Sequence, residues 1–135
     1  MKITVDTNVL LRAALGDDEA QQEVAIETLE SADVIAISVQ SLCELAWVLD
    51  RAYKTARADI AASIRRLLDM RNVVVNRPAV EAGLSVLDAG GDFADGVIAY
   101  DGKWLGGETF VSFDKAAVSL IVKQGQQARL LGSLK

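Results

Sequence analysis

Short apolar runs alternate along the chain with longer stretches in which apolar residues recur at helical spacing. Runs rich in β-branched residues at 3–5, 34–37, 73–75 and 109–113 predict four strands, and a weaker signal at 128–130 predicts a fifth. Between them the spacing predicts helices over residues 9–15, 17–31, 38–53, 56–70, 79–87, 92–104 and 114–123. Either Ser38 or Ser41 is a suitable cap for the third helix.

The order of these elements predicts a fold class. Strands that alternate with helices, without hairpin turns between them, favour a parallel sheet covered by helices on both faces. No linker, repeat or low-complexity segment interrupts the pattern. We therefore expect one α/β domain over residues 1–135, a three-layer α/β/α sandwich with a central parallel sheet.

Composition restricts the chemistry that such a domain can perform. The 135 residues are 51% hydrophobic, which is enough to bury a sizeable core, and they include no His and one Cys, Cys43. Nucleophiles activated by His, His-ligated zinc, disulfides and Cys clusters are thereby excluded. A catalyst of this composition would depend on carboxylates, Lys, Tyr, Ser or Thr. The N-terminus lacks the apolar segment of a signal peptide, and no apolar run approaches the length of a membrane span, so we expect a cytoplasmic protein without a membrane partner.

Charge is segregated along the chain. Residues 1–50 carry ten acidic and two basic side chains, whereas residues 51–77 carry seven basic and two acidic ones. This basic block consists of Arg51, Lys54, Arg57, Arg65, Arg66, Arg71 and Arg77. Its basic residues lie largely off the apolar stripe of the predicted helix, so a solvated face, RNA contact and contact with an acidic partner all remain open.

Four carboxylates fall at or near the carboxyl ends of predicted strands, where open parallel sheets bind ligands. Asp6 and Asp114 each follow a strand, Glu44 lies in the helix after the second strand, and Asp95 lies in the first turn of a later helix. Singly, the Asp residues could be helix caps, and Glu44, which interrupts the most apolar helix, is expected to be buried beside an Arg or a metal ion. Together, four carboxylates at one end of a sheet require cations. One or two Mg²⁺ or Mn²⁺ ions fit all-oxygen ligation, which indicates metal-dependent phosphate chemistry.

Four segments resemble the motifs of one known family. They are Asp6–Arg12 (DTNVLLR), Glu44–Leu49 (ELAWVL), Asp92–Ala99 (DFADGVIA) and Val111–Ala117 (VSFDKAA), and in this order they resemble PIN-domain ribonucleases, most closely the VapC-like toxins of toxin–antitoxin pairs. The resemblance spans nearly the whole chain. One departure is Gly96, where the family more often has a larger residue and where Gly is expected to weaken the helix.

The resemblance implies roles for individual residues. Asp6, Glu44, Asp95 and Asp114 would form the metal-binding catalytic quartet, while Asp92 would only cap its helix. The quartet would position and deprotonate a water with one or two Mg²⁺ or Mn²⁺ ions, leaving RNA products with a 5′ phosphate and a 3′ hydroxyl. Supporting hydrogen bonds are expected from Thr7, Asn8 and Ser112.

Partners are likewise implied by the resemblance. They are an RNA substrate, a cognate antitoxin, a second copy of the chain in a homodimer or toxin–antitoxin hetero-oligomer, and DNA only through the antitoxin. Candidate phosphate contacts are Arg12, Lys115, Arg65 and Arg66, although Arg12 and Lys115 are equally suited to ion pairs with the quartet. For Trp47 and Trp104 we expect core packing or a dimer contact rather than base stacking.

Two other function classes have a carboxylate after the first strand. A haloacid dehalogenase-like phosphatase requires a second Asp two residues later, where this chain has Asn8. A non-catalytic, phospho-accepting receiver domain requires an Asp after the third strand, where this chain continues with Asn76 and Arg77. Both are weaker alternatives to the ribonuclease.

Overall fold

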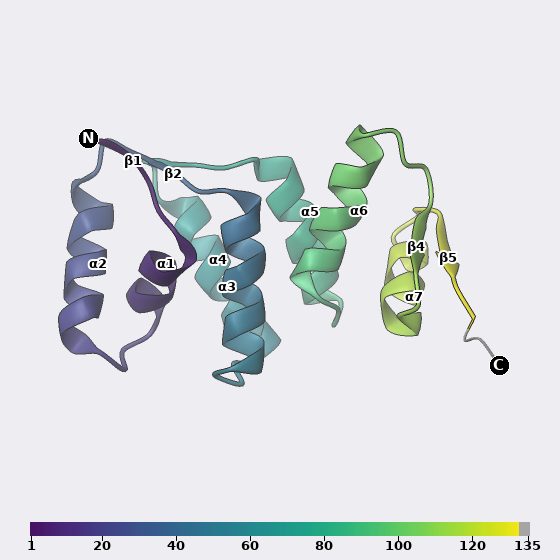
Figure 1. The fold of residues 1–135 in the computed structure, drawn as a ribbon, viewed down its shortest axis with the longest axis horizontal. Helices are drawn as coiled ribbons and strands as arrows, with labels where there is room; N and C mark the ends of the chain where they lie inside the picture. The colour runs from purple at the N-terminus through teal and green to yellow at the C-terminus, as the bar shows by residue number, and fades with distance from the viewer. Residues whose placement is uncertain (133–135) are drawn as a thin grey trace. The chain divides into compact units, whose positions relative to one another are not determined.

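The computed structural model describes residues 1–132, which fall into two compact units: the first is Met1–Asn76, and the second begins at Arg77. Both units contain parallel strands accompanied by helices (Figure 1). The predicted α/β class is therefore confirmed. The prediction of a single domain over residues 1–135 is not tested by this division. No helix within residues 1–132 is long and apolar enough to cross a bilayer.

The first unit contains a parallel sheet and four helices. Its elements are β1 (Lys2–Thr4), α1 (Thr7–Ala14), α2 (Glu19–Ser31), β2 (Val34–Ala36), α3 (Val39–Arg51), α4 (Arg57–Asp69) and β3 (Val73–Val74). The strand order is β1-β2-β3, and Ile3 of β1 is in register with the fully buried Ile35 of β2. Helix α1 packs against α2 and α3, and α3 packs against α4, so the carboxyl end of β1 leads directly into a packed helical layer.

The second unit contains α5 (Arg77–Asp88), α6 (Phe93–Trp104), β4 (Phe110–Ser112), α7 (Lys115–Lys123) and β5 (Ala128–Leu130). Strands β4 and β5 are parallel, and α7 packs against both. Helices α5 and α6 pack closely against each other. A Cβ atom at Gly96 of α6 would overlap the Ala82 carbonyl and lie 2.8 Å from Gly83 Cα, both in α5. Gly96 is thus a requirement of this close helix packing, whereas its helix propensity alone predicts only a weaker α6.

The predicted elements agree with the structure to within about two residues at each end, the usual uncertainty of element boundaries. The fifth strand, which had the weakest signal, is present at residues 128–130. The cap of α3 is Ser38, whose Oγ accepts a hydrogen bond from the Ser41 backbone N–H at 3.1 Å. Ser41 instead lies in the first turn, so the structure resolves this alternative.

Candidate active site

In the first unit, Asp6 begins α1 directly after β1. A carboxylate oxygen of Asp6, Oδ1, accepts a hydrogen bond from the Val9 backbone N–H at 3.1 Å, which is an ordinary N-cap. The side chain is exposed, and the cap occupies only one of its two oxygens. Asp6 can therefore stabilise α1 and still offer Oδ2 to a ligand.

Glu44 lies beside this helix start. The Thr7 hydroxyl of α1 donates a hydrogen bond to Glu44 Oε2 of α3 at 2.8 Å, and the packing of α1 against α3 makes this contact possible. The expectation that Glu44 is buried is wrong, because the residue is exposed. The apolar neighbours Leu42, Leu45 and Ala46 occupy the buried side of α3 instead. Asn8 is also exposed, and its supporting role stays a prediction.

Arg12 pairs with a residue outside the predicted quartet. Its Nη1 lies 3.1 and 3.3 Å from the two carboxylate oxygens of Asp17, in the segment between α1 and α2. Desolvation acts to lower the pKa of Arg12, but interactions with Asp17 and Tyr53 outweigh it and raise the pKa above its ordinary value. The ion pair that Arg12 forms is therefore with Asp17, which is outside the predicted quartet.

In the second unit, three carboxylates approach one another. Oxygen atoms of Asp92, Asp95 and Asp114 all lie within 4.8 Å of one another, at the start of α6 and the start of α7. Gly91, in the turn before α6, lies against α7, since a Cβ there would be 2.5 Å from Leu120 Cδ1. We call these three residues the Asp cluster.

Asp92 belongs to this cluster and does not cap α6 with its side chain. It occupies the N-cap position, but its carboxylate makes no capping hydrogen bond. The expectation that Asp92 only caps the helix is therefore wrong. Its signal was in the sequence: Asp92 and Asp95 are three residues apart, a spacing that places side chains next to each other on a helical turn.

Asp114 combines a structural and an electrostatic role. Its Oδ1 accepts a hydrogen bond from the Ala117 N–H at 3.1 Å and so caps α7. Its own backbone N–H donates to Ser112 Oγ at 2.9 Å, which fixes the turn between β4 and α7. The supporting role of Ser112 in the site stays a prediction. The next residue, Lys115, is exposed.

Electrostatic repulsion acts within the Asp cluster. Partial burial of Asp95, and then the negative charges of Asp92 and Asp114, raise the pKa of Asp95. Three carboxylates that repel one another in this way are a suitable donor set for a hard divalent cation, since Mg²⁺ and Mn²⁺ prefer oxygen ligands. The residues present therefore fit the metal that the sequence predicted.

The predicted site residues thus form two groups. Asp6, Thr7 and Glu44 lie together in the first unit, and Asp95 and Asp114 lie together with Ser112 in the second. The other candidate phosphate contacts lie on α4, where Arg65 and Arg66 are exposed, opposite its buried stripe of Ile60, Ile64 and Leu68. Arg66 Nε donates to the Ala62 carbonyl at 3.4 Å.

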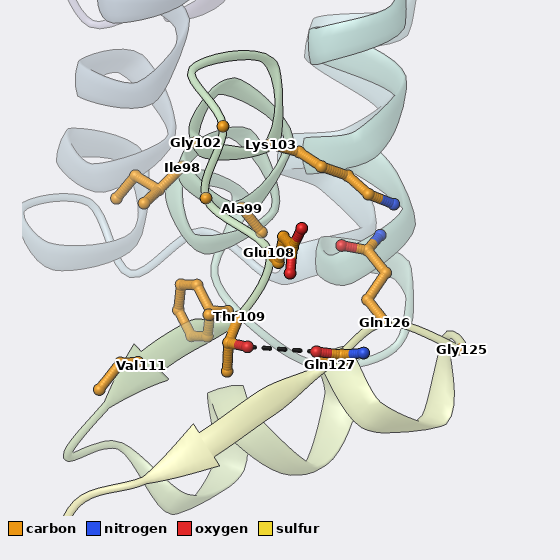
Figure 2. Close-up of a pocket in the computed structure, with 13 residues that line it drawn as sticks. Ile98, Ala99, Gly102, Lys103, Glu108, Thr109, Val111, Gly125, Gln126 and Gln127 are labelled. Carbon is orange, nitrogen blue, oxygen red and sulfur yellow. Dashed lines mark hydrogen bonds between the residues drawn. The ribbon is translucent and has the colours of Figure 1, made fainter.

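A cavity of about 780 Å³ occurs elsewhere in the second unit, at the carboxyl end of α6 and the amino end of β4 (Figure 2). The hydroxyl of Thr109 bonds to Gln127 Oε1 at 3.2 Å across its wall, and Lys103 and Glu108 are its charged lining residues. No sequence motif marks this cavity, so it could not be predicted from the sequence. None of the predicted site residues lines it.

Comparison with known proteins places the chain in one family. The PIN domain family matches residues 3–119, a span that includes all four predicted carboxylates. The chain therefore belongs to the PIN domain family, whose members are generally metal-dependent nucleases. No curated protein matches the chain significantly.

Proposed function

We propose that this protein is a metal-dependent endoribonuclease that hydrolyses RNA phosphodiester bonds. The observation that carries the proposal is the Asp cluster: mutually repelling carboxylates within 4.8 Å, in a chain that belongs to the PIN family. The carboxylate of Asp92 makes no capping hydrogen bond, and a divalent cation would offset the repulsion that helps to raise the pKa of Asp95.

Asp92, Asp95 and Asp114 would hold a Mg²⁺ or Mn²⁺ ion, one or two ions serving the complete site. Such an ion neutralises charge on a phosphodiester and lowers the pKa of water. The carboxylates of these three residues would supply the negative charge and the oxygen ligands that favour a hard divalent cation. Partial burial and the charges of Asp92 and Asp114 raise the pKa of Asp95, and a bound cation would act in the opposite direction by favouring its carboxylate form. Asp6 and Glu44 are the remaining members of the proposed catalytic set.

The capping geometry offers a clean test of the two capping carboxylates. Asn caps helices about as well as Asp, so Asp6→Asn and Asp114→Asn should keep α1 and α7 capped while removing one ligand charge each. A matched control is Asp18→Asn, because Asp18 caps α2 through Gln21 N–H at 3.0 Å and is outside the proposed set.

We expect wild type and Asp18→Asn to cleave a panel of structured RNAs in the presence of Mn²⁺ or Mg²⁺. Asp6→Asn and Asp114→Asn should lose cleavage while remaining folded, as shown by a cooperative thermal transition. The products should carry a 5′ phosphate and a 3′ hydroxyl, as read by end labelling. A 2′,3′-cyclic phosphate end, or full activity of Asp6→Asn, would contradict the proposal.

We further propose that this nuclease is the cytoplasmic toxin of a toxin–antitoxin pair. The four motifs in series, which most resemble the VapC-like toxins, support this role. Its partners would then be a homodimeric second copy, a cognate antitoxin that binds DNA on behalf of the complex, and RNA. Induced expression should arrest growth with wild type and not with Asp6→Asn. Coexpression of the reading frame immediately upstream should restore growth and copurify with the protein; growth arrest that this frame leaves unchanged would argue against the pairing.

A further inference from the structure

The cavity at the carboxyl end of α6 is a candidate binding site of its own in the second unit. Its volume of about 780 Å³ lies within the usual range of small-molecule sites, about 300–1,000 Å³. No member of the Asp cluster lines it. The cavity is therefore separate from the proposed metal site.

The lining of this cavity has a polar side and an apolar side. In Figure 2 the polar ends of Lys103, Glu108 and Gln126 are gathered on one side, and Ile98 and Val111 lie on the opposite side. Ile98 is 57% exposed and Val111 is 49% exposed, so a large part of each aliphatic side chain is open to a ligand. A molecule that fills the cavity would meet charged groups on one side and aliphatic groups on the other.

The two charges of the polar side are opposite and do not pair with each other. Lys103 lies in the last turn of α6, and Glu108 lies in the segment before β4. Among the residues that the structure describes, neither side chain has an ion-pair or hydrogen-bond partner. One ammonium group and one carboxylate are thus both available to a ligand in a single cavity.

Two helices end at the cavity and contribute to its electrostatics. Gly102 and Lys103 belong to the last turn of α6, and Gly125 and Gln126 follow the end of α7. The carbonyl end of a helix carries a partial negative charge, equivalent to about half an elementary charge. Together with Glu108, these two helix ends favour a positive group on the ligand, whereas Lys103 favours a negative one.

We propose that this cavity binds a small zwitterion with an apolar side chain, that is, a free α-amino acid or a dipeptide. The carboxylate of the ligand binds Lys103, and its ammonium group binds Glu108 and the carbonyl ends of the helices. Its side chain lies against Ile98 and Val111. This inference goes beyond the proposed nuclease function and does not depend on it.

Other classes of small molecule match only part of this lining. A phosphate or another plain anion is attracted by Lys103 but repelled by Glu108 and by the helix ends. A plain amine is attracted by those groups but repelled by Lys103. A neutral sugar leaves both charges without an ionic partner and places hydroxyl groups against Ile98 and Val111. A molecule that carries both charges and an apolar part matches all of these groups.

Titration of the full chain with defined ligands, in EDTA, tests the proposal. L-Leucine at millimolar concentration should cause saturable shifts of the Gly106, Gly107 and Gly125 amide signals in proton–nitrogen correlation spectra. Leucinamide lacks the carboxylate and isocaproate lacks the ammonium group, so each should bind at least about fivefold more weakly than leucine. Leucyl-glycine distinguishes the two sources of the ligand: tighter binding than leucine indicates a dipeptide, and weaker binding indicates a free amino acid.

Two variants assign the two charges. Lys103→Met should weaken the binding of leucine and abolish the preference for leucine over leucinamide, because the carboxylate has lost its partner. Glu108→Gln should likewise abolish the preference for leucine over isocaproate. The matched controls are Lys123→Met in the last turn of α7 and Glu81→Gln on α5, two exposed residues that do not line the cavity. Both controls should bind leucine like wild type.

Three results would overturn the proposal. The first is the absence of saturable shifts with both leucine and leucyl-glycine. The second is equal binding of leucine and leucinamide, or of leucine and isocaproate, which would indicate a site for a plain cation or a plain anion. The third is a folded Lys103→Met or Glu108→Gln protein that binds and discriminates these ligands like wild type. The comparison of ligands uses wild type alone, so it decides the question even if a variant does not fold.

Discussion

At the scale of single residues, the Asp cluster stores unfavourable electrostatic free energy. Asp95 is partly buried next to two carboxylates, which raises its pKa above that of the same residue in the unfolded chain. Asp6 and Asp114 each cap a helix with one carboxylate oxygen, so capping does not by itself set the cluster apart from other helix starts. What distinguishes the cluster is therefore the proximity of its members.

This repulsion makes stability depend on pH. Between the ordinary Asp pKa of about 4 and the raised pKa of Asp95, the folded chain binds this proton more tightly than the unfolded chain does. The free energy of unfolding therefore falls as the pH rises through this interval. We expect Asp95→Asn to remove this fall and to be more stable than wild type at neutral pH without metal. Urea unfolding across the pH range, with the exposed Glu81→Gln as control, measures it. If the free energy of unfolding changed with pH in the same way in wild type and in Asp95→Asn, Asp95 would not be the cause of the pH dependence.

At the scale of elements, the contact between α5 and α6 depends on glycine. A Cβ atom added at Gly83 would lie only 2.7 Å from the Phe93 ring, and one added at Gly96 would overlap the backbone of α5. Because α6 begins with Asp92 and Asp95, this close packing also fixes where the Asp cluster lies. Helix propensity would favour Ala at these positions, so packing has overruled propensity.

Two glycines of the same helix test this explanation. Gly96→Ala should lower the free energy of unfolding by about 1–3 kcal/mol, since the added methyl group overlaps the α5 backbone. Gly102→Ala should be neutral or raise it by up to about 1 kcal/mol, because nothing lies within 4 Å of a Cβ there. Chemical denaturation of both variants provides the comparison. A Gly96→Ala protein as stable as Gly102→Ala would contradict the close contact.

At the scale of the whole molecule, the PIN family match covers both compact units, and each unit carries its own predicted carboxylates. The net charge of −5 includes the charges of the four predicted ligands, Asp6, Glu44, Asp95 and Asp114. A cation that binds only the folded chain should therefore stabilise it as a whole.

We expect Mn²⁺ to raise the melting temperature of wild type, by a stabilisation of about 2.7 kcal/mol at one hundred times its Kd. EDTA should reverse the increase, and NaCl of equal ionic strength should not reproduce it. Asp95→Asn and Asp114→Asn should lose most of the increase, whereas Asp18→Asn should keep it. Equal increases in all four proteins would show that the ion binds elsewhere.

The sequence by itself determined the elements and the kind of chemistry. Periodicity and turn residues are local properties, so the strands and helices could be predicted to within about two residues, including the short strand at 128–130. The absence of His and the four motifs indicated an all-oxygen metal site in a PIN domain. The local sequence contained two equally good serines for the cap of α3, and only the conformation of the chain selected Ser38.

Tertiary structure decided the surroundings of individual side chains. Glu44 and Trp47 were expected among apolar residues because their sequence neighbours are apolar, yet they lie on the face of α3 that its packing leaves exposed. Asp92 was expected only as a cap, and it belongs to the Asp cluster because the start of α6 lies close to the start of α7 in the fold. Burial and proximity depend on which helix faces meet, and residues distant in sequence determine that.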